Sequence, residues 1–295
     1  MLELTDLRPC ANERVGLAHR PLIVGIGSET ARAGKSFVTA LLVKELARRN
    51  NPLISASCET SYPFSQLLLI VRNNQKLLGN MLDDRAQLEI LCEELVYGWL
   101  YGLVGDQHLV TLQNGVSPFA AWLAVHLPVL LPLLSQYLSC STPLSPEAVK
   151  DLLREQSYTP AARQLITHFG GAILTALSWT KLLSDSSHPQ ICMIPGVRTL
   201  EDCKYISMLG GIVLKVCTNS QAVEERYAEI GTADGKNRLT APWDTQLPNL
   251  PDMQYVPNAY RVGASLDERE NAAKETGCAI IKIVDQIENL ASSRR

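Results

Sequence analysis

Charged residues are absent from one long internal stretch, and the whole chain carries little net charge. The sequence has 295 residues and a formal net charge of −3, with no Asp, Glu, Lys or Arg between Asp106 and Glu147. This balance argues against a strongly basic protein that binds nucleic acid over its whole surface. A local basic groove stays open, because net charge does not report where the charges lie.

Cysteine pairs of the C-x-x-C kind are also missing. The eight cysteines are scattered along the chain, whereas zinc sites need ligands at short spacing. Several cysteines lie in apolar runs, where a thiol packs as a small hydrophobe. We therefore interpret them as structural thiols of a cytoplasmic protein in a reducing compartment.

The polar N-terminus and the charge-free stretch are the two segments that decide whether the sequence predicts secretion or membrane contact. Residues 1–20 contain Glu3, Asp6, Arg8 and Glu13, and are predicted to form an N-terminal extension rather than a secretory leader. The charge-free stretch holds an apolar run of about the 20 residues that a membrane span needs. Its prolines, together with the lack of flanking Lys or Arg, favour a buried or partner-facing helix pair without membrane contact.

Hydrophobic periodicity predicts an α/β protein. Short apolar runs predict strands buried on both faces at residues 21–27, 52–57, 190–195, 212–217 and, more weakly, 253–256. Helical spacing predicts helices at residues 36–47, 64–78, 85–103, 118–138, 172–183, 200–209 and 266–290, with shorter ones beginning at Pro146 and Pro160. Strands alternate with helices at both ends of the chain, which indicates a parallel sheet.

A phosphate-binding loop is predicted where the first strand gives way to a helix. Gly34-Lys35-Ser36 stands at this junction. Small loop residues let consecutive backbone N–H groups face phosphate oxygens, and the helix N-terminus adds partial positive charge. Lys35 is placed to reach the transferred phosphate and Ser36 to bind Mg²⁺. The residues expected to bind ATP are Gly27, Arg32, Ala33, Gly34, Lys35, Ser36 and Phe37.

The loop departs from the usual spacing G-x-x-x-x-G-K-[ST]. Glu29 occupies the position of the first glycine, and Gly27 is the nearest glycine upstream. A carboxylate beside phosphates is unfavourable unless it points away or meets the metal, and Arg32 is close enough in sequence to offset it. A chance Gly-Lys-Ser at a helix start, and hence a non-catalytic P-loop-like binding module, stays open.

A second basic residue follows a later strand. Pro195-Gly196-Val197-Arg198 ends the run 190–195, and the carboxyl ends of parallel strands face the ligand crevice of an open α/β sheet. Arg198 is suited there to clamp a phosphate, or it pairs with a carboxylate such as Glu201 or Asp202.

Four segments resemble phage deoxynucleoside monophosphate kinases. Residues 194–216 are similar to the family pattern D-V-R-F-x-N-E, a helix and G-G-x-V-I-x-V, although Gly196 stands where the family has an aspartate. Residues 25–36 resemble the family's phosphate loop, residues 159–170 its T-P-R-x-L-L-x-x-x-G segment with two residues inserted, and residues 256–258 its final strand. The segments follow the family's order.

The resemblance implies a P-loop kinase-type parallel sheet flanked by helices, with a helical insertion subdomain. The expected boundaries are the extension 1–20, a first core part 21–62, the mostly helical insertion or acceptor subdomain 63–188, and a second core part 189–295 with a lid-like loop 221–250. Arg226, Lys236 and Arg238 fall in that loop.

The resemblance also implies transfer of the ATP γ-phosphoryl group to a deoxynucleoside monophosphate, with ATP and Mg²⁺ as cofactors. The catalytic residues implied are Lys35, Arg163 and Arg198, and the metal ligands are Ser36 and Asp202. An alternative acceptor is a hydroxymethylated pyrimidine in phage DNA, which some relatives phosphorylate and which would need a wider cleft. The location would be the cytoplasm, that of the host if a phage encodes the chain, and a homodimer is compatible with the sequence.

Overall fold

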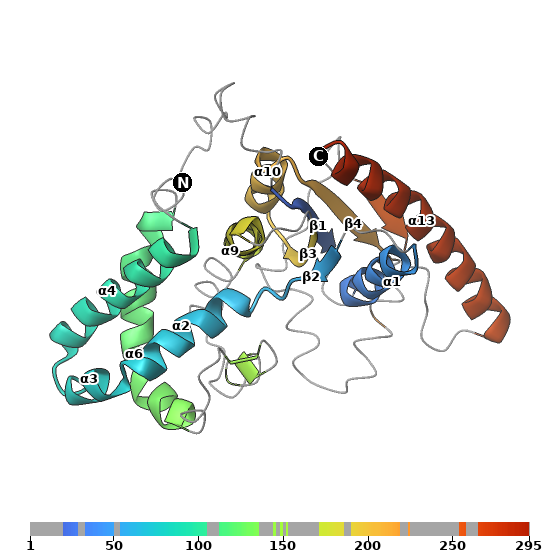
Figure 1. The fold of residues 1–295 in the computed structure, drawn as a ribbon. Helices are drawn as coiled ribbons and strands as arrows, with labels where there is room; N and C mark the ends of the chain where they lie inside the picture. Colours follow the sequence, from blue (N-terminus) through green and yellow to red (C-terminus); the bar gives the residue numbers. More distant parts are fainter. Residues whose placement is uncertain are drawn as a thin grey trace. The chain divides into compact units, whose positions relative to one another are not determined.

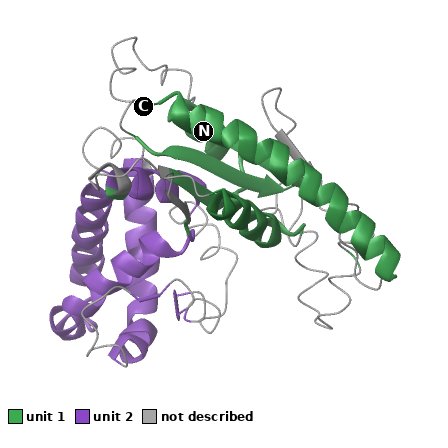
Figure 2. Cartoon of the chain, turned by 45° about the vertical axis from the view of Figure 1, so that its right-hand side comes forward, with its two compact units in different colours: residues 1–58, 182–295 green, residues 59–181 purple. Residues whose placement is uncertain are grey.

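The computed structural model divides the chain into two compact units. Unit 1 comprises residues 1–58 and 182–295, and unit 2 comprises residues 59–181 (Figure 2). The helical insertion predicted from the sequence, residues 63–188, overlaps unit 2 along most of its length. The structure describes residues 20–28, 33–49, 54–104, 112–135, 144–145, 148–149, 152, 171–185, 190–218, 224, 254–257 and 265–294.

Unit 1 is built on a five-stranded parallel sheet (Figure 1). Its strands are β1 (Leu22–Ser28), β2 (Ile54–Ser57), β3 (Gln190–Val197), β4 (Ile212–Cys217) and β5 (Gln254–Pro257). Their order across the sheet is β2-β3-β1-β4-β5, and every neighbouring pair is parallel. The predicted mixed α/β class with a parallel sheet flanked by helices is confirmed. The predicted β3 ended at Pro195 but the strand runs to Val197, with a register shift opposite Gly25 and Gly27 that accommodates Pro195-Gly196.

Two helices cover one face of this sheet. Helices α1 (Lys35–Arg48) and α13 (Leu266–Ser292) pack side by side. They share a core with β1, β3 and β4 that contains Leu22, Val24, Ile26, Val38, Leu42, Leu46, Ile191, Met193, Leu214, Val216, Ile280, Ile283, Val284 and Ile287. Alternate residues of the strands supply this face, as the two-residue repeat of a strand requires.

The opposite face of β1 is covered by α10 (Leu200–Met208), which approaches the strand closely because glycines line the contact. A Cβ on Gly25 would lie 2.5 Å from Ile206 Cδ1. A Cβ on Gly211 would lie 2.5 Å from the carbonyl oxygen of Ile23. Side chains at these two positions would push α10 away from the sheet.

Two glycine substitutions separate this packing effect from the general effect of removing a glycine. Gly211→Ala should destabilise the protein by roughly 1–3 kcal/mol, because the new methyl group meets backbone rather than a movable side chain. Gly277→Ala, inside α13 with nothing within 4 Å of the added Cβ, should stabilise it by about 0.5–1 kcal/mol. Chemical denaturation of both variants checks this. Equal stability of the two variants would contradict close packing of α10 on β1.

Unit 2 is helical in the residues that the structure describes. It contains α2 (Tyr62–Asn73), α3 (Gln75–Asn80), α4 (Arg85–Val104), the short 3₁₀ turn η3 (Gln113–Gly115), α6 (Val116–Ser135) and most of α9 (Ala172–Asp185). The prediction of a single helix over residues 64–78 is wrong. Helix α2 ends at Asn73, and the side-chain amide of the following residue, Asn74, donates to the carbonyl of Ile70 at 2.8 Å. This local bond competes with helix continuation.

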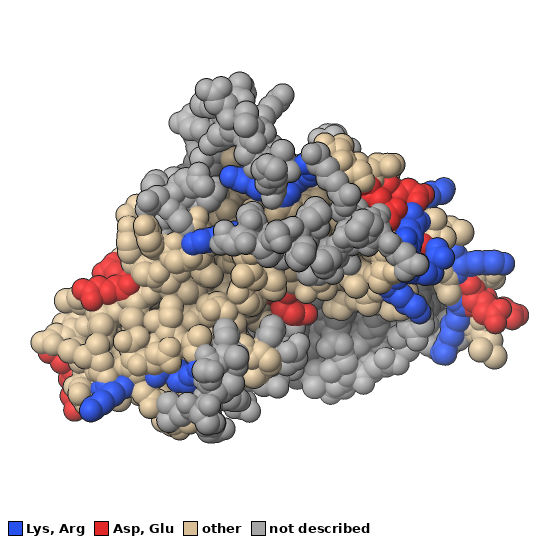
Figure 3. All heavy atoms as spheres, viewed as in Figure 1, with Lys and Arg blue, Asp and Glu red and all other residues tan. Residues whose placement is uncertain are grey.

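Helix α6 lies within the charge-free stretch. One face is buried in unit 2, where Phe119, Leu123 and Leu127 have no exposed surface. Phe119 packs against Trp99 and Phe64 at ring-centroid distances of 6.0 and 5.8 Å. By length and composition alone, the helix is long and apolar enough to cross a membrane. Its most apolar 18-residue segment has a mean hydropathy of 1.7, and 39% of that segment is buried inside the protein. On the face drawn in Figure 3, the surface over the helices of unit 2 is mostly uncharged.

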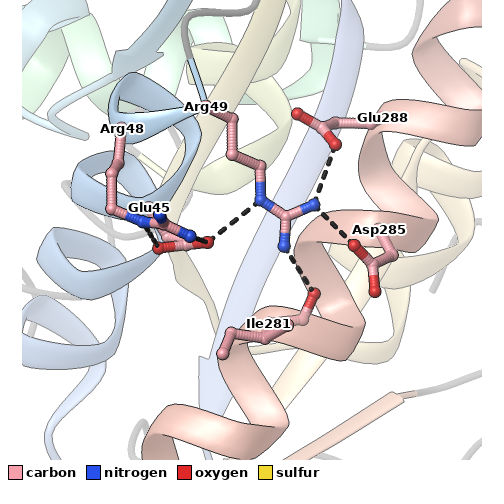
Figure 4. A network of polar contacts seen from close by, with 6 residues as sticks. All are labelled: Glu45, Arg48, Arg49, Ile281, Asp285 and Glu288. Carbon is pink, nitrogen blue, oxygen red and sulfur yellow. Dashed lines mark hydrogen bonds and ion pairs between the residues drawn. The ribbon is translucent and has the colours of Figure 1, made fainter.

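An ion-pair network joins the end of α1 to α13 (Figure 4). The guanidinium of Arg49 donates to Asp285 at 2.5 Å, to Glu288 at 3.0 Å and to Glu45 at 3.0 Å. It also donates to the carbonyl of Ile281 at 3.3 Å. Hydrogen bonds from Arg48 and Arg49 hold the pKa of Glu45 at about 2, below its ordinary value of 4.5. The network holds α13 against α1 and so supports the face that carries the core.

The depressed pKa gives the network a defined pH dependence. Ionised Glu45 contributes stability above pH 4.5, and this contribution is lost as the pH falls through about 2. Arg49→Met should therefore lower Tm by a few degrees at pH 7, and the difference from wild type should shrink toward pH 2 and in high salt. Thermal melts across pH measure this. Arg85→Met, which removes only the exposed pair with Glu89, is the control and should change Tm little. A pH-independent deficit in Arg49→Met would contradict the electrostatic account.

Candidate functional site

The carboxyl ends of β1 and β3 form the point where the sheet reverses its direction of winding. After β1 the chain enters α1 on one face, and after β3 it enters α10 on the other. The two strands are neighbours in the sheet, with Gly27 in register with Val197. Such a switch point is where open α/β sheets leave a crevice for ligands. The β1–α1 and β3–α10 turns therefore begin at the same edge of the sheet.

The end of the β1–α1 turn, where the sequence predicts a phosphate-binding loop, is described from Ala33 onward. Gly34 adopts φ 95° and ψ 24°, a left-handed conformation that favours glycine. Lys35 follows as the first residue of α1, and its Nζ donates to the Ser28 hydroxyl at the end of β1 at 2.8 Å. This hydrogen bond joins the two ends of the turn. Residues 29–32, which include Glu29 and Arg32, lie outside the described residues.

The start of α1 is electrostatically suited to an anion. It has no side-chain cap and no acidic residue in its first turn, and a lysine occupies its first position. The starts of α10 and α13 differ, because each has a capping box with an acidic residue in the first turn. A cation at a helix N-terminus opposes the helix dipole by about 0.3–1 kcal/mol. An anion bound at this terminus would relieve that repulsion.

The β3–α10 turn is fixed by a capping box. The backbone N–H groups of Arg198 and Thr199 both donate to Asp202 Oδ2, at 3.0 and 3.1 Å. The backbone N–H of Asp202 donates in return to the Thr199 hydroxyl at 3.1 Å. Asp202 is buried, whereas Arg198 is exposed at the sheet edge. The carboxylate predicted to bind metal therefore holds the turn that presents Arg198.

Removal of either half of this box should loosen the turn. Thr199→Ala and Asp202→Ala should each cost about 1 kcal/mol of stability, and the double variant should cost less than the sum because the two bonds are reciprocal. Equilibrium unfolding of the three variants measures this. An unchanged stability of Asp202→Ala, together with a raised Mg²⁺ requirement for nucleotide binding, would instead assign Asp202 to the metal.

Two further residues at this edge were not predicted from the sequence. Ser28 holds the lysine ammonium, and Lys215 lies on β4 in register with Gly27, with 1% of its surface exposed. The sequence could have singled out Lys215, because a lysine inside the apolar run Ile212–Cys217 is unusual and buried charges are rare without compensation. No feature of the sequence singled out Ser28 in the same way. The Thr-x-x-Asp spacing of the β3–α10 turn was also readable as a helix start.

The predicted site residues divide into three groups. The first group lies around the β1–α1 turn: Gly27 near the end of β1, Ala33 and Gly34 directly before α1, and Lys35, Ser36 and Phe37 at the start of α1. The second group lies around the β3–α10 turn, with Arg198 before α10 and Asp202 in its first turn. Both turns lie at the same sheet edge, as the register of β1 with β3 requires. Arg32, Arg163 and the lid-like residues Arg226, Lys236 and Arg238 lie outside the described residues.

The described residues suit a bound triphosphate with magnesium. Ala33 and Gly34 place no large side chain directly before α1, and the hydroxyl-bearing Ser36 is exposed on the first turn of α1. Among the described residues, no group of three His, Cys, Asp or Glu side chains is placed to hold a metal ion. Mg²⁺ in phosphate-transfer sites takes only one or two protein ligands, with the remainder from phosphate and water.

Comparison of the chain with protein-family models, with curated proteins and with solved structures finds no match.

Proposed function

We propose that this protein is a P-loop kinase that binds ATP with Mg²⁺ and transfers the γ-phosphoryl group to a deoxynucleoside monophosphate. The observation that carries the proposal is the turn from β1 into α1. A left-handed glycine, an uncapped helix start without acidic residues, and a lysine ammonium across the turn occur together there. The P-loop kinase fold and the resemblance to phage deoxynucleotide kinases are parts of the same proposal.

Each residue has a distinct role in this proposal. The backbone N–H groups from Gly34 onward point to the phosphates, and Lys35 exchanges its bond to Ser28 for a phosphate oxygen. Ser36 binds Mg²⁺, which neutralises phosphate charge when it is bound. Phosphoryl transfer depends mainly on positioning and on charge neutralisation, so these contacts carry most of the catalysis.

Arg198 is proposed to bind the acceptor or the transferring phosphate. It is exposed, and the capping box fixes its backbone at the edge shared with Lys35. A guanidinium binds phosphate through two parallel hydrogen bonds, which orients as well as neutralises it. Buried Lys215 on the neighbouring strand adds a third basic residue to this edge. Arg163 is proposed for the acceptor side on the resemblance alone.

Lys35→Ala tests the proposed function. It should lower phosphoryl transfer at least 100-fold while Tm stays close to that of wild type, because Lys35 is only partly buried. Lys44→Ala, an exposed lysine on the same helix, is the matched control and should retain full activity. ATP consumption is measured with each deoxynucleoside monophosphate and with DNA that contains hydroxymethylated pyrimidines.

The choice of acceptor separates the remaining functions. Turnover on free monophosphates supports the proposal. Turnover on modified DNA alone would show instead that the protein is a kinase of hydroxymethylated pyrimidines in DNA. Binding of ATP without turnover on any acceptor indicates a non-catalytic binding module. Full activity of Lys35→Ala would remove the mechanism itself.

A further inference from the structure

Two buried cysteines contact each other at the β2 edge of the sheet. The Sγ atoms of Cys58 and Cys192 are 3.1 Å apart, and neither residue has exposed surface. Cys58 immediately follows β2, and Cys192 lies in β3, where it is in register with Ala56. The two thiols therefore belong to neighbouring parallel strands of unit 1, although 134 positions separate them in the sequence.

The backbone around the pair is fixed independently of the sulfur atoms. The N–H of Cys58 donates to the carbonyl of Met193 at 2.7 Å, which extends the β2–β3 ladder by one residue. A thiol–thiol hydrogen bond is weak and gives little stability in return for bringing the two sulfur atoms together. A disulfide has an S–S length of about 2.0 Å, so an approach of about 1 Å would close the bond.

We propose that Cys58 and Cys192 are a modification site that forms a reversible disulfide when a low-molecular-weight disulfide, such as oxidised glutathione, oxidises the protein. One cysteine thiolate attacks the small disulfide and releases one small thiolate. The second cysteine attacks the resulting mixed disulfide and releases the other. The two protein thiols lose two electrons and two protons, and one small disulfide becomes two thiols.

The position of the pair at an edge strand explains how an oxidant can reach it and what a disulfide there would do. β2 is an edge strand of four residues, so local opening there breaks fewer hydrogen bonds than opening at the centre of the sheet. The chain leaves unit 1 after Cys58 and returns at Leu182. A Cys58–Cys192 bond would close a loop that contains all of unit 2, and closure of a long loop restricts the unfolded chain strongly.

Thiol mapping of the full-length protein tests the proposal. Reduced protein is incubated with oxidised glutathione, quenched with acid, alkylated under denaturing conditions and digested for mass spectrometry. We expect a peptide containing Cys58 linked to one containing Cys192, a mass lower by two hydrogens, reversal by dithiothreitol, and a higher Tm for the oxidised form. Glutathione on exposed Cys278 is a separate and distinguishable product.

Two variants control for other pairings. Cys203→Ala removes a buried thiol on α10 and should leave the cross-link intact. Cys192→Ala should abolish it and leave Cys58 without a cysteine partner. Complete alkylation of both Cys58 and Cys192 after oxidation, or their linkage to other cysteines, would overturn the proposal. The wild-type peptide map decides the matter even if Cys192→Ala does not fold. None of these outcomes depends on nucleotide binding.

Discussion

The contact between Lys35 and Ser28 is the interaction around which the candidate site is built. It joins the first residue of α1 to the last residue of the central strand β1, across a turn that ends in left-handed Gly34. Core contacts hold both ends of this turn. β1 is buried along its whole length, and α1 buries Val38, Leu42 and Leu46 against the sheet. The turn is therefore presented by rigid elements, while its lysine opposes the dipole of its own helix. The first turns of α10 and α13 each carry a carboxylate, whereas the first turn of α1 carries none.

Close packing on the other face brings the second basic residue to the same edge. Gly25 and Gly211 allow α10 to lie against β1, and the capping box of Thr199 and Asp202 fixes the point where α10 begins. Arg198 precedes that point, beside the end of β1. The network around Arg49 holds α13 against α1 on the first face. The two helix layers thus position the two turns from opposite sides of the sheet.

Local features of this structure were largely predictable, and long-range ones were not. The apolar runs of β1, β3 and β4, and the Gly34-Lys35-Ser36 junction, were evident because periodicity and glycine content act over a few residues. The order of the strands depends on which strands pair, and periodicity carries no information on that. The proximity of Cys58 to Cys192 and the position of Lys215 beside Gly27 follow from that order. The break at Asn74 was missed because a side-chain bond to Ile70 outweighed the apolar spacing.

The most direct test of the central claim is a crystal structure with a non-hydrolysable ATP analogue and Mg²⁺. The account predicts phosphate oxygens within hydrogen-bond distance of the backbone N–H groups at the start of α1, with Lys35 Nζ moved from Ser28 to a phosphate and Ser36 on the metal. A nucleotide bound elsewhere while Lys35 keeps its bond to Ser28, or a Glu29 carboxylate occupying the turn, would contradict it.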